Sequence, residues 1–215
     1  MDWAAKLDLY CERTGPELLS EPVNALTNVA FFIAAWLLWR DARRRGVLSG
    51  DVQLLVWLIV AIGSGSALFH TFATRWAHLL DNTPILAFQL AFLWLYARRA
   101  LGWRHVAAAA LAATFLLVAL YARQFPGLAS GSITYAPALV ALALLGTYHR
   151  VARKPGAWLL LAAAGVFTLS LALRTVDEAA CPWLPLGTHF FWHLLNAVVL
   201  YLCVRALPSA RKTME

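Results

Sequence analysis

Three histidines, one serine and one carboxylate occupy spacings in this sequence that suit a metal site. Ser66 and His70 are four residues apart, so on a helix they lie on one face. His189 and His193 repeat this spacing near the C-terminus. Asp81 follows His70 by eleven residues. Because such polar side chains are costly at the ends of apolar helices, their presence indicates a function.

The chemistry that these residues suit is metal-assisted hydrolysis. Neutral imidazole is a good zinc ligand, and three protein ligands with an open position for water are typical of catalytic zinc sites. We therefore predict that His70, His189 and His193 bind zinc, which lowers the pKa of a bound water to about 7. This zinc-bound water is the expected nucleophile. Asp81 is expected to accept its proton and return it to a leaving group, and Ser66 to donate a hydrogen bond to a developing oxyanion.

The elements that hold these residues are expected to be membrane helices. The chain has 215 residues, of which 61% are hydrophobic and 13% are charged, whereas a soluble domain carries about 25% charged residues. Its mean hydropathy is +0.66. The net charge of +7 does not indicate nucleic-acid binding, because the basic residues form short clusters between apolar runs. The first 22 residues lack the basic and apolar regions of a secretory signal peptide.

Seven apolar runs predict an all-α membrane protein, a seven-transmembrane helix bundle. Each run is close to the roughly 20 residues that cross a bilayer as a helix. The runs are continuous and do not alternate with polar residues, which favours helices over strands. The predicted spans cover residues 23–39, 53–70, 83–100, 105–121, 133–149, 157–173 and 188–206.

The distribution of Lys and Arg predicts how this bundle is oriented. Five of the 18 basic residues lie before the first span or in the connections 2–3, 4–5 and 6–7, and the other 13 lie in the remaining connections and the tail. Because cytoplasmic loops are enriched in Lys and Arg, the N-terminus is expected outside and the C-terminus in the cytoplasm. The chain then divides into an acidic extracytoplasmic segment, 1–22, a transmembrane hydrolase domain, 23–206, and a cytoplasmic tail, 207–215.

This topology places the predicted zinc ligands and Asp81 on one membrane face, the extracytoplasmic one. His78 lies on the same side, three residues before Asp81, and is a weaker candidate for the site. A lone histidine near a helix end more often makes a structural hydrogen bond than binds a metal. That interpretation fits His105 and His149, which lie beside arginines at the predicted cytoplasmic ends.

Other polar residues are expected to support the structure. Arg174, Asp177 and Glu178 close the sixth span on the outer side, where we expect ion pairs or contacts at the mouth of the site. Asn196 lies on the same helical face as His193 and is a candidate for orienting it, as partners of metal ligands do.

Several stretches taken together resemble the alkaline ceramidases. These stretches are Ser66-x-x-x-His70, Asp81 within LLDNTPI, HFFWH at 189–193, Tyr10-Cys11-Glu12 and EPVNALTN at 21–28. That family belongs to a wider group of seven-span metal-dependent hydrolases, which includes the adiponectin and progestin receptors. The resemblance implies that the three histidines bind zinc, assisted by Asp81 and Ser66. It also implies that the substrate is a ceramide-like N-acyl sphingoid lipid, hydrolysed to a fatty acid and a sphingoid base.

The resemblance also implies a calcium site in the N-terminal segment. Its ligands would be the carboxylates of Asp8, Glu12 and Glu21 and the backbone carbonyl of Tyr10. Carboxylate and carbonyl oxygens are the ligands that calcium prefers. The chain departs from the eukaryotic members at Leu9, where they carry an acid. The alternative is a solvated acidic cap, in which Glu21 begins the first helix and is favoured by the helix dipole.

The three cysteines suggest one covalent link. Cys11 and Cys181 are both predicted outside, where a disulfide between them is permitted and would tie the N-terminal segment to the 6–7 connection. The resemblance also favours this pair. The alternative is two free, partly buried thiols. Cys203 lies within the last span and is expected to serve packing.

The leading hypothesis is therefore a zinc-dependent intramembrane amidase that acts on ceramide-like membrane lipids. A hydrolase of another lipid ester or amide is an alternative, and so is a lipid receptor or binding protein with structural zinc. A photoreceptor or proton pump is disfavoured, because Lys6, Lys154 and Lys212 all lie outside the predicted spans and leave no intramembrane Schiff-base lysine. The oligomeric state stays open.

Overall fold

The computed structural model describes residues 2–207, and this part of the chain is helical with no strand beyond one isolated bridge between Lys6 and Thr74. Its helices are α1 (Pro22–Thr27), α2 (Val29–Arg44), α3 (Gly50–Phe72), α4 (Arg75–Arg99), α5 (His105–Ala122), the 3-10 helix η1 (Leu128–Tyr135), α6 (Ala136–Val151), α7 (Leu159–Thr175), α8 (Asp177–Ala180) and α9 (Phe190–Ala206). The predicted tail, 207–215, lies outside the described residues except for Leu207.

Each of the seven predicted spans coincides with a long helix, and four of these helices are long and apolar enough to cross a membrane. These four are Pro22–Arg44, which joins α1 and α2, Gly50–Phe72, His105–Ala122 and Leu128–Val151. α7 and α9 are apolar but have 17 residues each, and α4 has 25 residues but a more polar first half. The chain is thus an integral membrane protein by length and composition.

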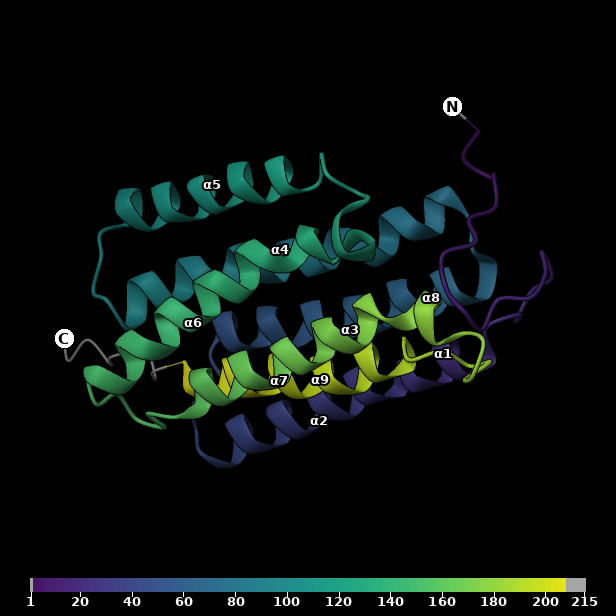
Figure 1. The fold of residues 1–215 in the computed structure, drawn as a ribbon. Coiled ribbons are helices and arrows are strands. Elements are labelled where there is room, and N and C mark those ends of the chain that lie inside the picture. Colours follow the sequence, from purple (N-terminus) through teal and green to yellow (C-terminus); the bar gives the residue numbers. More distant parts are fainter. Residues whose placement is uncertain (1, 208–215) are drawn as a thin grey trace.

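The long helices lie lengthwise beside one another (Figure 1). Their contacts close a ring, in which each helix packs on the next in the order α2, α3, α4, α5, α6, α7 and α9, and α9 packs on α2. Side chains that point into the ring, such as Leu55, Ile59, Tyr96 and Leu160, are fully buried. Large apolar side chains also cover the outside of the bundle, which suits contact with lipid. α3 touches α9 across the ring, and this contact brings the two histidine-bearing helices together.

Gly65 allows α3 and α4 to approach closely. A Cβ atom at this position would lie 2.2 Å from the carbonyl oxygen of Leu80 and 3.2 Å from the backbone nitrogen of Asp81. Only glycine fits such a contact between two helix backbones. The consequence for the site is that Asp81 lies directly beside the turn of α3 that carries Ser66.

Asp81 does not open its helix, which corrects the expectation that the third span begins near residue 83. The turn after α3 is very short, because Ala73 adopts a left-handed conformation (φ 47°) and α4 begins at Arg75. Asp81 therefore lies inside α4. Polar residues and Pro84 make this stretch resemble a connection in the sequence, yet the helix continues through it.

The N-terminal segment, residues 2–21, lies across the turn between α3 and α4. The backbone N–H of Leu7 donates to the carbonyl of Ala73 at 2.7 Å, and the Lys6 ammonium donates to the carbonyl of Phe72 at 2.8 Å. The predicted disulfide between Cys11 and Cys181 is confirmed, with their Cα atoms 5.5 Å apart. In Figure 1 this purple segment lies at the end of the bundle that also holds α1 and α8. We call this end the site end.

Candidate metal centre

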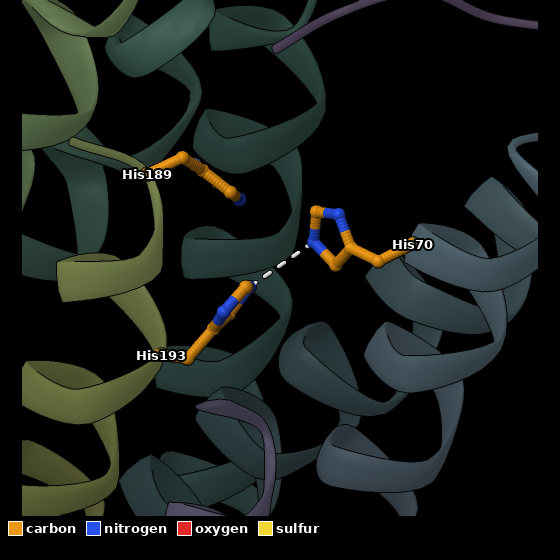
Figure 2. Close-up of side chains that lie close together, drawn as sticks. All are labelled: His70, His189 and His193. Atoms are coloured by element: carbon orange, nitrogen blue, oxygen red, sulfur yellow. Dashed lines mark hydrogen bonds between the residues drawn. The ribbon is translucent and has the colours of Figure 1, made fainter. Parts of the chain in front are cut away.

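The three predicted zinc ligands converge at the site end. His70 comes from the last turn of α3, His189 immediately precedes α9, and His193 lies in its first turn. All three are at most 2% exposed, and one ring nitrogen from each lies within 4.8 Å of the others. Figure 2 shows the side chains of His189 and His193 on one side and that of His70 on the other, all three pointing toward a common centre. In the described part of the chain this is the one group of three or more His, Cys, Asp or Glu side chains that could hold a metal ion.

Glu21 holds the ring of His70. Its Oε2 lies 2.5 Å from Nδ1 of His70, and its Oε1 forms an ion pair of 2.6 Å with the guanidinium of Arg13. Burial alone would raise the pKa of Glu21, but the hydrogen bond from His70 and the charge of Arg13 outweigh it and hold the pKa below its usual range. Since the carboxylate is an acceptor, Nδ1 of His70 donates to it, and in the neutral ring Nε2 then carries a lone pair.

Thr27 performs the same task for His193. Its hydroxyl lies 2.9 Å from Nδ1 of His193 and donates to the carbonyl of Val23 at 2.8 Å. With its proton used in this way, the hydroxyl accepts from Nδ1, so Nε2 of His193 also carries a lone pair. The α1 helix therefore fixes the ring through its last residue.

The two lone pairs face each other across 3.1 Å, the distance between Nε2 of His70 and Nε2 of His193. Such an arrangement is repulsive unless a cation lies between the nitrogens. Two nitrogens bound to one tetrahedral zinc ion at about 2.0–2.1 Å are themselves about 3.3–3.4 Å apart. The geometry of this pair thus fits a shared metal ion.

His189 supplies an unsatisfied third nitrogen. Its Nδ1 is buried with no hydrogen-bond partner in the described structure. Its ring stacks on Tyr10, with centroids 3.6 Å apart and an interplanar angle of 17°. Burial raises the pKa of the Tyr10 phenol, so this stacking partner stays neutral. One nitrogen of the His189 ring lies within 4.8 Å of a nitrogen of each of the other two histidines, so this buried ring is the third that a bound cation could contact.

Asp177 positions the turn that leads into α9. Its Oδ1 accepts the backbone N–H groups of Thr188 at 2.6 Å and His189 at 2.8 Å, and its Oδ2 accepts that of Cys11 at 3.0 Å. The carboxylate is 2% exposed. Asp177 therefore has the structural role that we expected, but it fulfils this role by accepting hydrogen bonds from backbone N–H groups and not by forming an ion pair. One side chain ties His189 and the N-terminal segment together.

Ser66 and Asp81 lie beside the histidines. The Ser66 hydroxyl is 3.5 Å from Nε2 of His193 and interacts with the Asp81 carboxylate. Ser66 is buried one turn before His70 on α3, whereas Asp81 lies on α4 and contacts Ser66 from there. The structure thus brings all five residues of the predicted zinc and catalytic set into one cluster.

Two cavities meet at Asp81. The first, about 90 Å³, runs inside the ring between apolar side chains that include Phe88, Phe115 and Phe167, and it reaches Ser66. The second, about 780 Å³, lies at the site end between polar side chains. Asp81 and Tyr135 line both. We call them the apolar cavity and the polar cavity.

The residues predicted to bind calcium do not form one group. Both oxygens of Glu12 accept backbone N–H groups at the start of α1, from Val23 at 2.6 Å and from Asn24 at 2.8 Å. Asp8 is exposed. The structure therefore gives the calcium site no support, because Glu12 caps a helix, Glu21 is paired with Arg13 and His70, and the carbonyl of Tyr10 accepts the backbone N–H of Arg13.

The remaining histidines and Asn196 are placed as follows. His149 is buried and hydrogen-bonded to Tyr96 and to the carbonyl of Pro155, in agreement with a structural role. His78 lines the polar cavity and is not one of the three converging histidines. Asn196 donates to the Ser170 hydroxyl of α7 at 3.1 Å and to a backbone carbonyl, so it forms an interhelical hydrogen bond, and the partner at Nδ1 of His193 is Thr27.

The described chain is thus an all-helical membrane protein with a buried group of three histidines that could hold a metal ion, beside an aspartate that lines both cavities. The chain matches the family model described as Ceramidase over residues 7–214, so it is a member of the ceramidase family, and the resemblance is confirmed at that level. No curated protein sequence matches it closely enough to name a relative. The family implies an amide hydrolase that acts on lipid.

Proposed function

We propose that this protein is a zinc-dependent intramembrane amidase that hydrolyses ceramide-like N-acyl lipids to a fatty acid and a long-chain amine. The observation that carries the proposal is the cluster of three buried histidines beside Ser66 and Asp81, because Asp81 lines both the apolar and the polar cavity. An amphiphile bound across this junction has its chains in the apolar part, its head in the polar part and its amide beside Asp81.

Zinc is the metal that this donor set favours. Three imidazole nitrogens suit zinc and not the hard cations calcium or magnesium, which prefer oxygen. When bound, zinc would acidify a water molecule toward a pKa of about 7 and polarise the substrate carbonyl. Glu21 and Thr27 keep His70 and His193 in the tautomers that such a metal requires.

Asp81 and Ser66 are assigned the proton and oxyanion chemistry. Asp81 takes the proton of the attacking water and passes it to the departing amine, so that the amine leaves uncharged and the carboxylate is regenerated. Ser66 donates a hydrogen bond to the oxygen that gains negative charge at the carbonyl carbon. The contact of Asp81 with the Ser66 hydroxyl, and the position of that hydroxyl 3.5 Å from Nε2 of His193, support this division.

The apolar cavity is assigned to the chain nearest the amide. Its volume of about 90 Å³ is small, so the rest of a long chain extends between helices toward the lipid. We also assign the seven long helices to seven membrane spans and the site end to the extracytoplasmic face. The excess of basic residues in the connections at the other end supports this orientation.

The test is hydrolysis of defined lipids by purified protein of known metal content. Ceramides, other lipid amides and lipid esters are incubated with and without a chelator, and free fatty acid is measured. We expect release from ceramide that stops on chelation. No release from any lipid by zinc-loaded protein would leave a lipid receptor with a structural metal as the better assignment, and release from esters alone would change the substrate class.

Two substitutions separate metal binding from proton transfer. His193→Ala should abolish both bound metal and turnover, whereas Asp81→Asn should keep the metal and lower kcat by about 10²–10⁴-fold. His105→Ala, at the start of α5 away from the site, is the matched control and should change neither. Full activity of Asp81→Asn would remove Asp81 from the proposed mechanism.

A further inference from the structure

The polar cavity contains more positive charge than the proposed hydrolysis uses. Three arginines line it, Arg75 at the start of α4, Arg123 at the end of α5 and Arg174 near the end of α7. His78 lines it as well. No ion pair joins any of these arginines to a carboxylate within residues 2–207, although other arginines of the chain do form such pairs.

Arg174 is held in place by neutral groups. One of its terminal nitrogens donates to the carbonyl of Ser130 at 3.0 Å and to the hydroxyl of Ser132 at 2.9 Å. The guanidinium also lies over the rings of Tyr135 and Trp192, with its central carbon 5.4 and 5.6 Å from their centroids. These contacts orient a positive charge toward the cavity and leave it without a bonded anion.

The acids of the same cavity have other partners or other tasks. Asp177 uses both oxygens on backbone N–H groups, and Asp81, which attracts the charge of Arg174 without forming an ion pair with it, is the proposed base beside Ser66. Glu178 is exposed at the rim. Arg123 is exposed and has no side-chain hydrogen bond or ion pair in the described structure, so its five donors are available.

The size of the polar cavity argues for a substantial headgroup. About 780 Å³ is far more than a hydroxymethyl group needs, and the carboxylate of a released fatty acid forms at Asp81 and not beyond it. Guanidinium groups match the oxygens of phosphate and carboxylate in paired hydrogen bonds. We propose that Arg123 and Arg174 bind an oxyanion on the headgroup of the intact lipid, so that the preferred substrate is an N-acyl lipid with a phosphate monoester or similar anionic head. This inference rests on the proposed function for its substrate backbone.

The test measures binding and so does not depend on turnover. A short-chain N-acyl sphingosine, its phosphate monoester and a fatty acid of the same acyl length are each titrated into Asp81→Asn protein in neutral detergent. We expect the phosphate monoester to bind about tenfold or more tightly than the neutral lipid and than the fatty acid. This advantage should shrink about fivefold or more when Arg123→Gln is added, because a charged hydrogen bond is lost.

Arg104→Gln is the matched control, because Arg104 is an exposed arginine at the opposite end of the same helix. It should leave the advantage unchanged. Equal affinity for the neutral and the phosphorylated lipid would overturn the inference, as would an advantage that Arg123→Gln does not reduce. Equal binding of the fatty acid would assign the arginines to the product and not to the headgroup.

Turnover separates this inference from the proposed function. Hydrolysis of neutral ceramide together with equal binding of both lipids would keep the amidase and overturn the headgroup site. Selective binding of the phosphate monoester with no hydrolysis of any lipid would keep the headgroup site and overturn the amidase.

Discussion

At the scale of single residues, the arrangement of the three histidines depends on the groups that contact their rings. Glu21 and Thr27 each use one oxygen to fix the proton on a ring nitrogen, so that His70 and His193 present lone pairs to each other. Tyr10 stacks on His189, and Asp177 fixes the backbone at that residue. Such partners orient ligands and raise their affinity for metal.

Glu21 provides the sharpest residue-scale prediction. In Glu21→Gln the side chain loses its charge and presents an amide donor to Arg13 or to Nδ1 of His70, both of which are donors. We expect metal affinity to fall by about 10–100-fold, measured as zinc retained in competition with a chelator. The melting temperature should also fall, because the buried guanidinium of Arg13 loses its anion.

Glu17→Gln is the control for this change, because Glu17 is an exposed acid in the same segment. It should keep both zinc and stability. A Glu21→Gln protein that retains zinc but loses a calcium ion bound by the unmodified protein would restore calcium as the role of Glu21.

At the scale of elements, the contact between α3 and α4 determines whether Asp81 reaches Ser66. Gly65→Ala would bring a methyl group within 2.2 Å of the carbonyl oxygen of Leu80, so the two helices must separate. We expect a loss of roughly 1–3 kcal/mol in stability and a clear fall in kcat, while zinc content stays close to that of the unmodified protein.

Gly165→Ala is the matched substitution, because this glycine of α7 faces open space. Alanine there should preserve activity and raise helix stability by up to about 1 kcal/mol. Equal thermal stability and equal kcat for the two variants would show that the close approach at Gly65 does not position Asp81.

The sequence predicted helices well where the signal lies within one segment, and less well where a helix depends on contacts with distant segments. Long apolar runs predicted every long helix, because span length and hydropathy are properties of one segment. The start of α4 was missed because its first turns are polar, although they lie under the N-terminal segment. The convergence of the three histidines on one place was predictable from their residue type, their spacing and the family resemblance.

The partners of the histidines were not predictable in this way. His70 and Glu21 are 49 residues apart, and His193 and Thr27 are 166 apart, so only the fold brings each pair together. An isolated acidic segment also suits calcium as well as it suits a buried ion pair. The deciding residue, Arg13, lies in the same segment but has no sequence pattern that marks it as a partner of Glu21.

At the scale of the whole molecule, two independent features point to the same orientation. Lys and Arg are concentrated in the connections at the end opposite the site end, as expected for cytoplasmic loops. The Cys11–Cys181 disulfide lies at the site end, and disulfides persist in oxidising compartments outside the cytoplasm. We therefore propose that the histidine cluster and the polar cavity lie on the side away from the cytoplasm.

This orientation is testable with cysteine labelling in sealed membrane vesicles whose cytoplasmic face is inside. Thr14→Cys introduces a thiol in the exposed N-terminal segment, and Trp103→Cys introduces one at the exposed turn between α4 and α5. A membrane-impermeant maleimide should label Thr14→Cys at once and Trp103→Cys only after the vesicles are opened. The unmodified protein is the background control, because Cys11 and Cys181 are paired and Cys203 is buried. The reverse pattern would place the histidine centre on the cytoplasmic face and would require the disulfide to form after the membrane is disrupted.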